Sequence, residues 1–281
     1  MSAILLATDL SPHADRALAR AALLAMGRGD GLDVLHVVSR DLMSGPQHAA
    51  ALAQATEVLR DELAEAGLPE GLAVTPLPRG GEVGQAIVQA TKEQGSHLVV
   101  LAAPHSDLLV QIFRASVLNT VVRHAPCPVL VVRRRARQDY RRIVVAVDLS
   151  LPSRRALELA LRLLPGAAMA QATLSVVHAQ TTSAPPGEAA EQRARVDDML
   201  AASLGRLAAE GRAAPAATEI VVQTGQPLAV VAEAAARSRA ELVIVGTMGL
   251  TGAANLLLGS TAEALLATLP CDVLAVRAIE S

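Results

Sequence analysis

Short apolar runs alternate with longer amphipathic stretches along the whole chain. The short runs are apolar at successive positions, which is typical of strands covered on both faces of a sheet. Strands that alternate with helices predict a parallel sheet with right-handed crossovers. In the C-terminal half, strands are expected near 142–147, 172–178, 218–223, 241–246 and 272–277, and helices near 152–164, 188–210, 227–238 and 260–268.

The same pattern occurs twice, at an offset of about 140 residues. Four segments recur in the same order, so the chain is interpreted as a duplication with domains at 1–136 and 140–281. Five strands and four helices per copy favour a flavodoxin-like doubly wound sheet, whose ligand crevice lies at the carboxyl ends of the strands. The matched pairs are 3–11 with 143–150, 34–37 with 176–179, 98–101 with 242–245, and 126–132 with 270–276.

Composition narrows the class of protein. The formal net charge of −2 argues against a general nucleic-acid binder. Residues 133–142 hold six Arg and one Asp, a local charge of +5. Subtracting this from the net charge of −2 leaves −7 for the rest of the chain. This run is read as a solvated linker, with a nucleic-acid or acidic-lipid patch as the alternative. Cys127 and Cys271 fit neither a metal site nor a disulfide framework, and a cytoplasmic protein with no membrane span is expected.

A glycine pattern follows the fourth strand of the second copy. Gly246-Thr247-Met248-Gly249 is separated by nine residues from Gly259-Ser260-Thr261, which opens a helix. Glycine permits a sharp turn and close backbone approach, and a helix N-terminus attracts phosphate through its unpaired N–H groups. The hydroxyls of Ser260 and Thr261 add donors, and Ser260 is also a candidate helix cap. Glycines at strand ends are common for structural reasons, so the full spacing carries the argument.

The G-x₂-G-x₉-G-S spacing, together with the two-copy organisation, resembles the universal stress protein family in its tandem-domain form. The resemblance implies two flavodoxin-like, adenine nucleotide α-hydrolase-like units and ATP binding by the second. It also implies that Asp148 lies by the nucleoside and that Ala179, where many members carry Val, contacts adenine. Asp148 has a structural alternative as a cap or turn residue. The expected site comprises Asp148, Ala179, Gly246, Met248, Gly249, Gly259, Ser260 and Thr261.

The first copy lacks the loop. Aligning Pro126 with Pro270 places Ala102, His105 and Ala115 where the second copy has its glycines, and only Ser116 is retained. Asp9 and Val37 remain at the adenine-side positions, so weak nucleoside binding there is conceivable, but no ATP is expected. His36 and His178 end the second strands and are read as structural residues, since nothing nearby supplies a second ligand or a nucleophile.

Three functions are considered. The favoured one is an ATP-binding stress-response or signalling protein, whose nucleotide, with or without Mg²⁺, regulates an unidentified protein partner. The alternatives are a nucleotide-free interaction module and a slow ATPase. No Lys or Arg lies between Gly246 and Ser260, so phosphoryl transfer lacks its usual cation and the chain is not expected to be an efficient enzyme. The last strands, 129–133 and 273–277, are expected at sheet edges, where pairing would give an internal pseudo-dimer and a homodimer.

Overall fold

The computed structural model describes residues 3–12, 14–39, 46–103, 108–180, 187–247 and 258–277, and for residues 39, 46, 48 and 108–115 it describes the backbone alone. The chain divides into two compact units, Met1–Gln138 and Asp139–Ser281. Met248 and Gly249 of the predicted site and His105 of the first copy lie outside the described residues.

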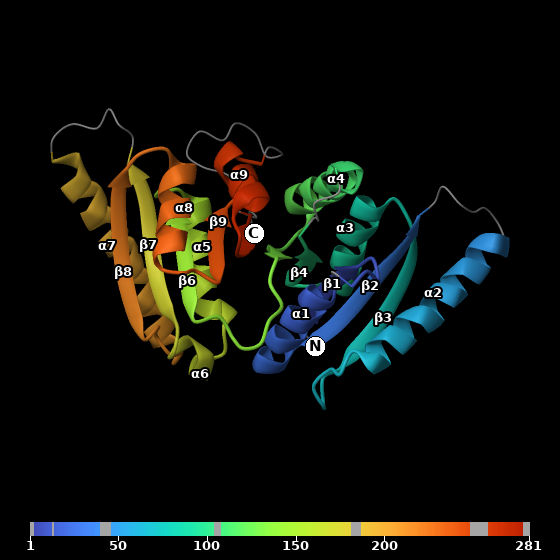
Figure 1. Cartoon of the computed structure of the whole chain (residues 1–281). Coiled ribbons are helices and arrows are strands. Elements are labelled where there is room, and N and C mark those ends of the chain that lie inside the picture. The colour runs from blue at the N-terminus through green and yellow to red at the C-terminus, as the bar shows by residue number, and fades with distance from the viewer. Residues whose placement is uncertain are drawn as a thin grey trace. The chain divides into compact units, whose positions relative to one another are not determined.

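The first unit is a five-stranded sheet with helices on both faces (Figure 1). Its strands are ordered β3-β2-β1-β4-β5 and every adjacent pair is parallel. In chain order its elements are β1 (Ala3–Thr8), α1 (Asp15–Arg28), β2 (Gly31–Ser39), α2 (Pro46–Glu65), β3 (Val74–Gly81), α3 (Val83–Gln94), β4 (Leu98–Ala102), α4 (Leu108–His124) and β5 (Val129–Val132).

The second unit repeats this topology, with the order β10-β9-β6-β7-β8 and parallel pairs throughout. The predicted α/β class and doubly wound parallel sheets are confirmed, and the predicted strands and helices of this unit agree with the structure to within two residues. Its elements are β6 (Arg142–Val147), α5 (Leu151–Leu163), α6 (Gly166–Met169), β7 (Thr173–Gln180), α7 (Glu188–Ala209), β8 (Ala217–Thr224), α8 (Pro227–Arg237), β9 (Leu242–Gly246), α9 (Ser260–Thr268) and β10 (Asp272–Val276).

The cores consist of aliphatic side chains from the strands and the inward faces of the helices. Central strand residues such as Leu5 and Val144 have no exposed surface. Tyr140 is also fully buried, and its hydroxyl donates a 2.7 Å hydrogen bond to Oδ2 of the buried Asp272. Among the described residues no helix combines the length and the apolar character needed to cross a membrane.

The arginine-rich run at 133–142 is only partly the solvated linker that the sequence suggested. Its exposed members include Arg135 and Arg137. At its start, the guanidinium of Arg16 donates to the carbonyl of Arg133 at 2.7 Å. At its end, Arg142 forms a 2.6 Å ion pair with Glu241. These bonds hold both ends of the run against their own units, so charge repulsion alone does not describe it.

In both units the second and third strands are added on one side of the first strand, and the fourth and fifth strands are added on its other side. The order of the strands therefore reverses between the first and the fourth strand. In the second unit these are β6 and β9, which are hydrogen-bonded neighbours. A doubly wound sheet opens a crevice at this point, at the carboxyl ends of its strands. The elements that border it in the second unit are the starts of α5, α8 and α9, because each of these helices follows a strand.

Candidate functional site

Asp148 lies just past the carboxyl end of β6, in a tight turn. Its Oδ1 accepts hydrogen bonds from the backbone N–H of Ser150, at 3.0 Å, and from the Ser150 hydroxyl. Leu149, between them, has a φ of +65°, which is uncommon for a residue with a side chain. The structural alternative for Asp148, a turn bond, is therefore present. Its Oδ2 makes no hydrogen bond to a described residue and remains an acceptor at the crevice.

The first unit has the same turn. Oδ1 of Asp9 accepts from the N–H of Ser11 at 3.1 Å and from its hydroxyl at 2.6 Å, and Leu10 has a φ of +58°. Because both units keep this turn, the carboxylate has a structural role that does not depend on a ligand. A ligand role for Asp148 would be an addition to it.

The strand-end histidines hold the first two strands of each unit together. Nδ1 of His178 lies 2.8 Å from the carbonyl oxygen of Val147, and Nδ1 of His36 lies 3.0 Å from that of Thr8. Nε2 of His178 also contacts the side-chain oxygen of Gln192 at 3.0 Å. No group of three His, Cys, Asp or Glu side chains suited to a metal occurs among the described residues. The geometry agrees with the structural interpretation of both histidines.

Gly246 and Gly259 close the base of the predicted loop. The N–H of Gly259 donates a 2.8 Å hydrogen bond to the carbonyl of Thr247, so the loop leaves and returns at one point. A Cβ on Gly246 would lie 3.2 Å from backbone atoms of Pro152 and Ser153 at the start of α5. A Cβ on Gly259 would lie 3.3 Å from the Thr247 carbonyl oxygen. Both glycines therefore serve close packing, whatever else they do.

Ser260 begins helix α9, and Gly259 is its N-cap. The expectation that Ser260 caps the helix is wrong, since no side chain bonds the first turn and Ser260 is already its first helical residue. Ser260 is exposed and Thr261 half-buried. Neither hydroxyl bonds a described residue, and the N–H groups of residues 260–262 have no partner among the described residues. Within the part of the chain that the structure describes, this helix end presents unpaired donors, the condition for anion binding.

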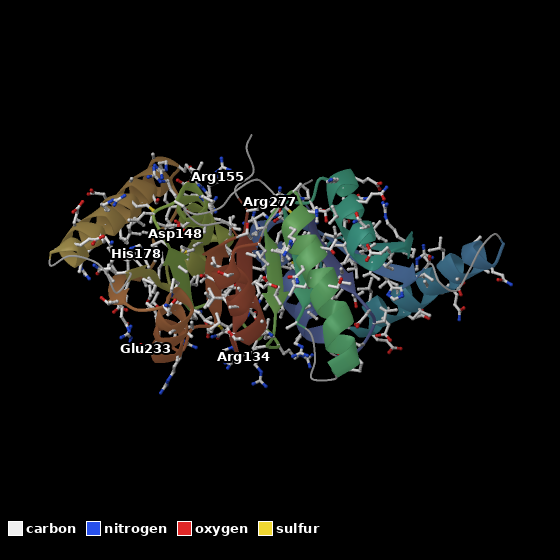
Figure 2. The ribbon with its side chains drawn as sticks, turned by 90° about the horizontal axis from the view of Figure 1, so that it is seen from above. Arg134, Asp148, Arg155, His178, Glu233 and Arg277 are labelled. Atoms are coloured by element: carbon white, nitrogen blue, oxygen red, sulfur yellow. The ribbon has the colours of Figure 1, made fainter. Side chains whose placement is uncertain are left out.

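A chain of contacts joins these residues into one site. The Asp148 N–H lies 3.3 Å from the hydroxyl of Ser153, Ser153 borders Gly246, and Gly246 leads through Thr247 to the start of α9. Ala179 lies one residue beyond His178 on β7, half-buried. The predicted residues within the described part thus lie at the ends of β6, β7 and β9 and at the start of α9. Figure 2 labels Asp148 and the neighbouring strand-end residue His178.

Sequence reasoning missed two neighbours of this site. It sought cations only inside the loop, whereas Arg277 directly follows Val276, the register partner of Gly246 on β10. Arg155 lies in the first turns of α5, two residues beyond Ser153. Both are labelled in Figure 2, and each already takes part in an interaction of its own. Arg277 lies near this site only because β10 pairs with β9. No pattern in the sequence shows that pairing.

The first unit differs at the matching place. Ala102 ends β4, as Gly246 ends β9. Helix α4, however, begins at Leu108 and continues through Ala115 and Ser116. The first unit therefore has helix interior where the second has the N-terminus of α9, and the N–H groups near Ser116 lie within a helix.

Comparison with known proteins places both units in one family. The model of the universal stress protein family matches residues 1–133 and again 139–277. A universal stress protein from Thermus aquaticus is 36% identical over 138 residues, which is 46% of this chain and 97% of that protein.

Solved structures of the same family resemble the whole chain. A universal stress protein from Archaeoglobus fulgidus has a TM-score of 0.69 at 21% identity and covers 98% of both chains. A putative universal stress protein from Pseudomonas aeruginosa has a TM-score of 0.65 at 24% identity and covers 99% of this chain and 93% of its own. At these identities the likeness concerns the fold. With the family model matched in both halves, the chain belongs to the universal stress protein family, as a tandem of two such domains.

Proposed function

We propose that the second unit binds ATP at the carboxyl end of its sheet and that the bound nucleotide regulates contacts with a protein partner. The phosphates would lie on the N-terminus of α9, bonded by the N–H groups of residues 260–262 and by the hydroxyls of Ser260 and Thr261. The ribose or base would lie by Asp148 and Ala179. Two solved members of the family are complexes, one with cAMP and one, from Arabidopsis thaliana, with AMP. Whether this chain does the same depends on its own residues.

The observation that carries the proposal is the start of α9, whose first N–H groups have no partner among the described residues. Neither Gln226, the N-cap of α8, nor Gly259, the N-cap of α9, forms a side-chain cap bond. Two helix ends that open on one crevice with unpaired N–H groups create a positive potential there. This potential favours a polyanion, and Oδ2 of Asp148 offers an acceptor for a ribose hydroxyl or a base amine.

Mg²⁺ would enter with the nucleotide. The described residues hold no cluster of carboxylates or histidines able to bind it. The hydroxyls of Ser260 and Thr261 are oxygen donors of the kind Mg²⁺ accepts, and the phosphates would supply its other ligands. Mg²⁺ would neutralise phosphate charge at this helix end.

A nucleotide-free interaction module is the second candidate, and one observation favours it. Because Gly246 and Gly259 both avoid close contacts with backbone, packing alone explains two of the three loop glycines. A slow ATPase is less favoured, since the loop contains no Lys or Arg to stabilise charge in phosphoryl transfer, and Arg155 and Arg277 near the site each already take part in an interaction.

The first experiment asks whether the purified protein carries or takes up adenine nucleotide. The protein is denatured and the supernatant chromatographed, and the folded protein is titrated with ATP while its melting temperature is recorded. Released ATP or ADP, or a rise in melting temperature that saturates with ATP, supports the proposal. No released nucleotide together with no shift refutes it and leaves the interaction module. Turnover well above background would establish the ATPase instead.

A further inference from the structure

The first unit has a cavity between helices α1 and α2. Its volume is about 490 Å³, within the roughly 300–1,000 Å³ of small-molecule sites. It lies over Leu6 of β1 and Val34 of β2, and the residues that line it all belong to the first unit. Most of its walls are aliphatic. The aliphatic members from the two helices and the turn after α2 include Leu18, Ala22, Leu23, Leu59, Leu63 and Leu68.

In the second unit two ion pairs bridge the matching helices. Arg206 of α7 pairs with Glu158 of α5. Glu210, which directly follows α7, pairs with Arg162 of α5. Each pair joins the two helices across the space between them.

The first unit lacks the residues for both bridges. The first helices are aligned through Asp9 and Asp148, and the second helices through Gly67 and Gly211. These two glycines each lie two residues beyond the end of their helix, with φ of +61° and +67°. In this alignment neither ion pair can form, because three of the four matched side chains are apolar. The matched residues are Ala19, Leu23, Glu62 and Ala66, and all four line the cavity.

Charged side chains of opposite sign border the cavity. Two arginines of α1 bond carbonyls at both ends of the segment 133–138 and hold that segment along the helix. Arg135 and Arg137 of this segment line the cavity and are exposed, and so are Glu62 and Glu65 of α2. None of these four side chains has a partner within the described part of the chain. The cavity therefore has cations on the side of α1 and carboxylates on the side of α2.

We propose that this cavity binds a single-chain amphiphile with a zwitterionic head, the chemistry of a lysophospholipid. The aliphatic walls would bury the chain. Arg135 and Arg137 would bind the phosphate, since guanidinium groups suit phosphate oxygens. Glu62 and Glu65 would lie by the positive end of the head. Asp15, at the start of α1, also lines the cavity, so a head of one sign would meet charges of both signs.

Dodecylphosphocholine is the probe, used as a monomer below its critical micelle concentration. Calorimetric titration should give one saturable site per chain. Phosphocholine, which is the same head without the chain, should bind at least about tenfold more weakly, because the chain makes the apolar contacts. Dodecanoate and dodecyltrimethylammonium carry one charge each and should both bind about threefold or more weakly than the zwitterion.

One double variant tests the place of binding. Leu23→Arg combined with Ala66→Glu rebuilds in the first unit an ion pair that bridges the helices of the second. It should close the cavity and abolish binding of dodecylphosphocholine. Circular dichroism checks that the variant is folded, and if it is not, the charge variants decide.

A second double variant tests the recognition of the head. Arg135→Ala with Arg137→Ala should weaken dodecylphosphocholine about threefold to tenfold and should not weaken dodecyltrimethylammonium. The matched control is Arg60→Ala with Lys92→Ala, which removes two exposed positive charges of the same unit away from the cavity lining. The control should bind both amphiphiles as the wild type does.

The proposal is overturned if monomeric dodecylphosphocholine shows no saturable binding, or if the folded closing variant binds it as the wild type does. Equal binding by the arginine variant and its control would also overturn it. Binding to phosphatidylcholine vesicles without binding of the monomer would indicate a membrane surface and contradict the assignment. These measurements need no ATP and concern the first unit, so this proposal and the ATP site fail separately.

Discussion

Asp148 combines a structural role with a proposed binding role, and one substitution separates them. Asp148→Asn keeps an oxygen that can accept from Ser150, so the turn and the melting temperature should be unchanged. The second carboxylate oxygen becomes an NH₂ donor, so ATP affinity should fall about tenfold. Calorimetric titration with ATP and thermal unfolding provide the two measurements.

Asp9→Asn is the matched control, because it makes the same change in the first unit. It should leave ATP affinity unchanged. A loss of stability without a change in affinity in Asp148→Asn would assign Asp148 to the turn alone.

His97 makes the stability of the first unit depend on pH. Burial lowers the pKa of His97, and the nearby Asp30, 3.1 Å from its Nε2, offsets this only in part. The unfolded chain therefore binds the proton first as the pH falls through about 6.5, and stability is lost between that pH and the lower pKa of the folded state. Relative to His97→Gln, the wild type should lose stability below about pH 6.5 in urea unfolding. A relative gain would mean that the Asp30 pair dominates.

At the scale of residues, the sequence located the candidates but not their contacts. Asp148 and His178 could be placed at strand ends because the apolar runs stop there. The contact of Gly246 with Pro152 and Ser153 joins segments almost a hundred residues apart, and no local pattern encodes it. The N-cap of α9 is Gly259 and not Ser260. The sequence did not show this, because the exact first residue of a helix depends on backbone angles.

At the scale of elements, two glycines in helices predict opposite responses to one substitution. A Cβ on Gly84 in α3 would lie 2.9 Å from Cβ and Cγ2 of Thr120 in α4, so the helices must move apart. Gly84→Ala should therefore destabilise the protein by about 1–3 kcal/mol. Gly205 in α7 has no atom within 4 Å of its added Cβ, so Gly205→Ala should stabilise by about 0.5–1 kcal/mol.

Urea unfolding followed by circular dichroism measures both changes. Thr120→Gly should restore part of the stability that Gly84→Ala loses. In a chain that keeps Gly84, the same substitution should not raise stability. If Gly84→Ala stabilised the protein, the close crossing of α3 and α4 would be contradicted.

Most elements follow from periodicity, and the exceptions have physical reasons. Helix α6 has only four residues, too few to show a helical period, and was not expected. The start of α4 at Leu108 was not predicted either. Aligning Pro126 with Pro270 matches residue positions, but it does not show where each helix begins. That difference, more than the lost glycines, separates the two crevices.

At the scale of the molecule, assembly is predicted from sheet edges. Within its own unit, β5 lies at one edge of the sheet beside β4, and β10 lies at one edge beside β9. The opposite edge of the first unit, β3, contains Pro76 and Pro78, which cannot donate backbone hydrogen bonds. The homodimer expected from the sequence is tested by the mass of this 29.0 kDa chain in solution. Light scattering should give twice that mass, and a monomer at every concentration tested would refute the assembly.

The central claim is a single ATP site per chain, located in the second unit. Calorimetric titration with ATP tests it most directly through the stoichiometry. Ser260→Asp adds a negative charge that suits a helix N-terminus but repels phosphate, whereas Ser116→Asp makes the same change at an exposed residue of α4. One ATP per chain is expected in wild type and Ser116→Asp, and affinity about a hundredfold weaker or lost in Ser260→Asp. Two ATP per chain, or equal binding by the two variants, would contradict it.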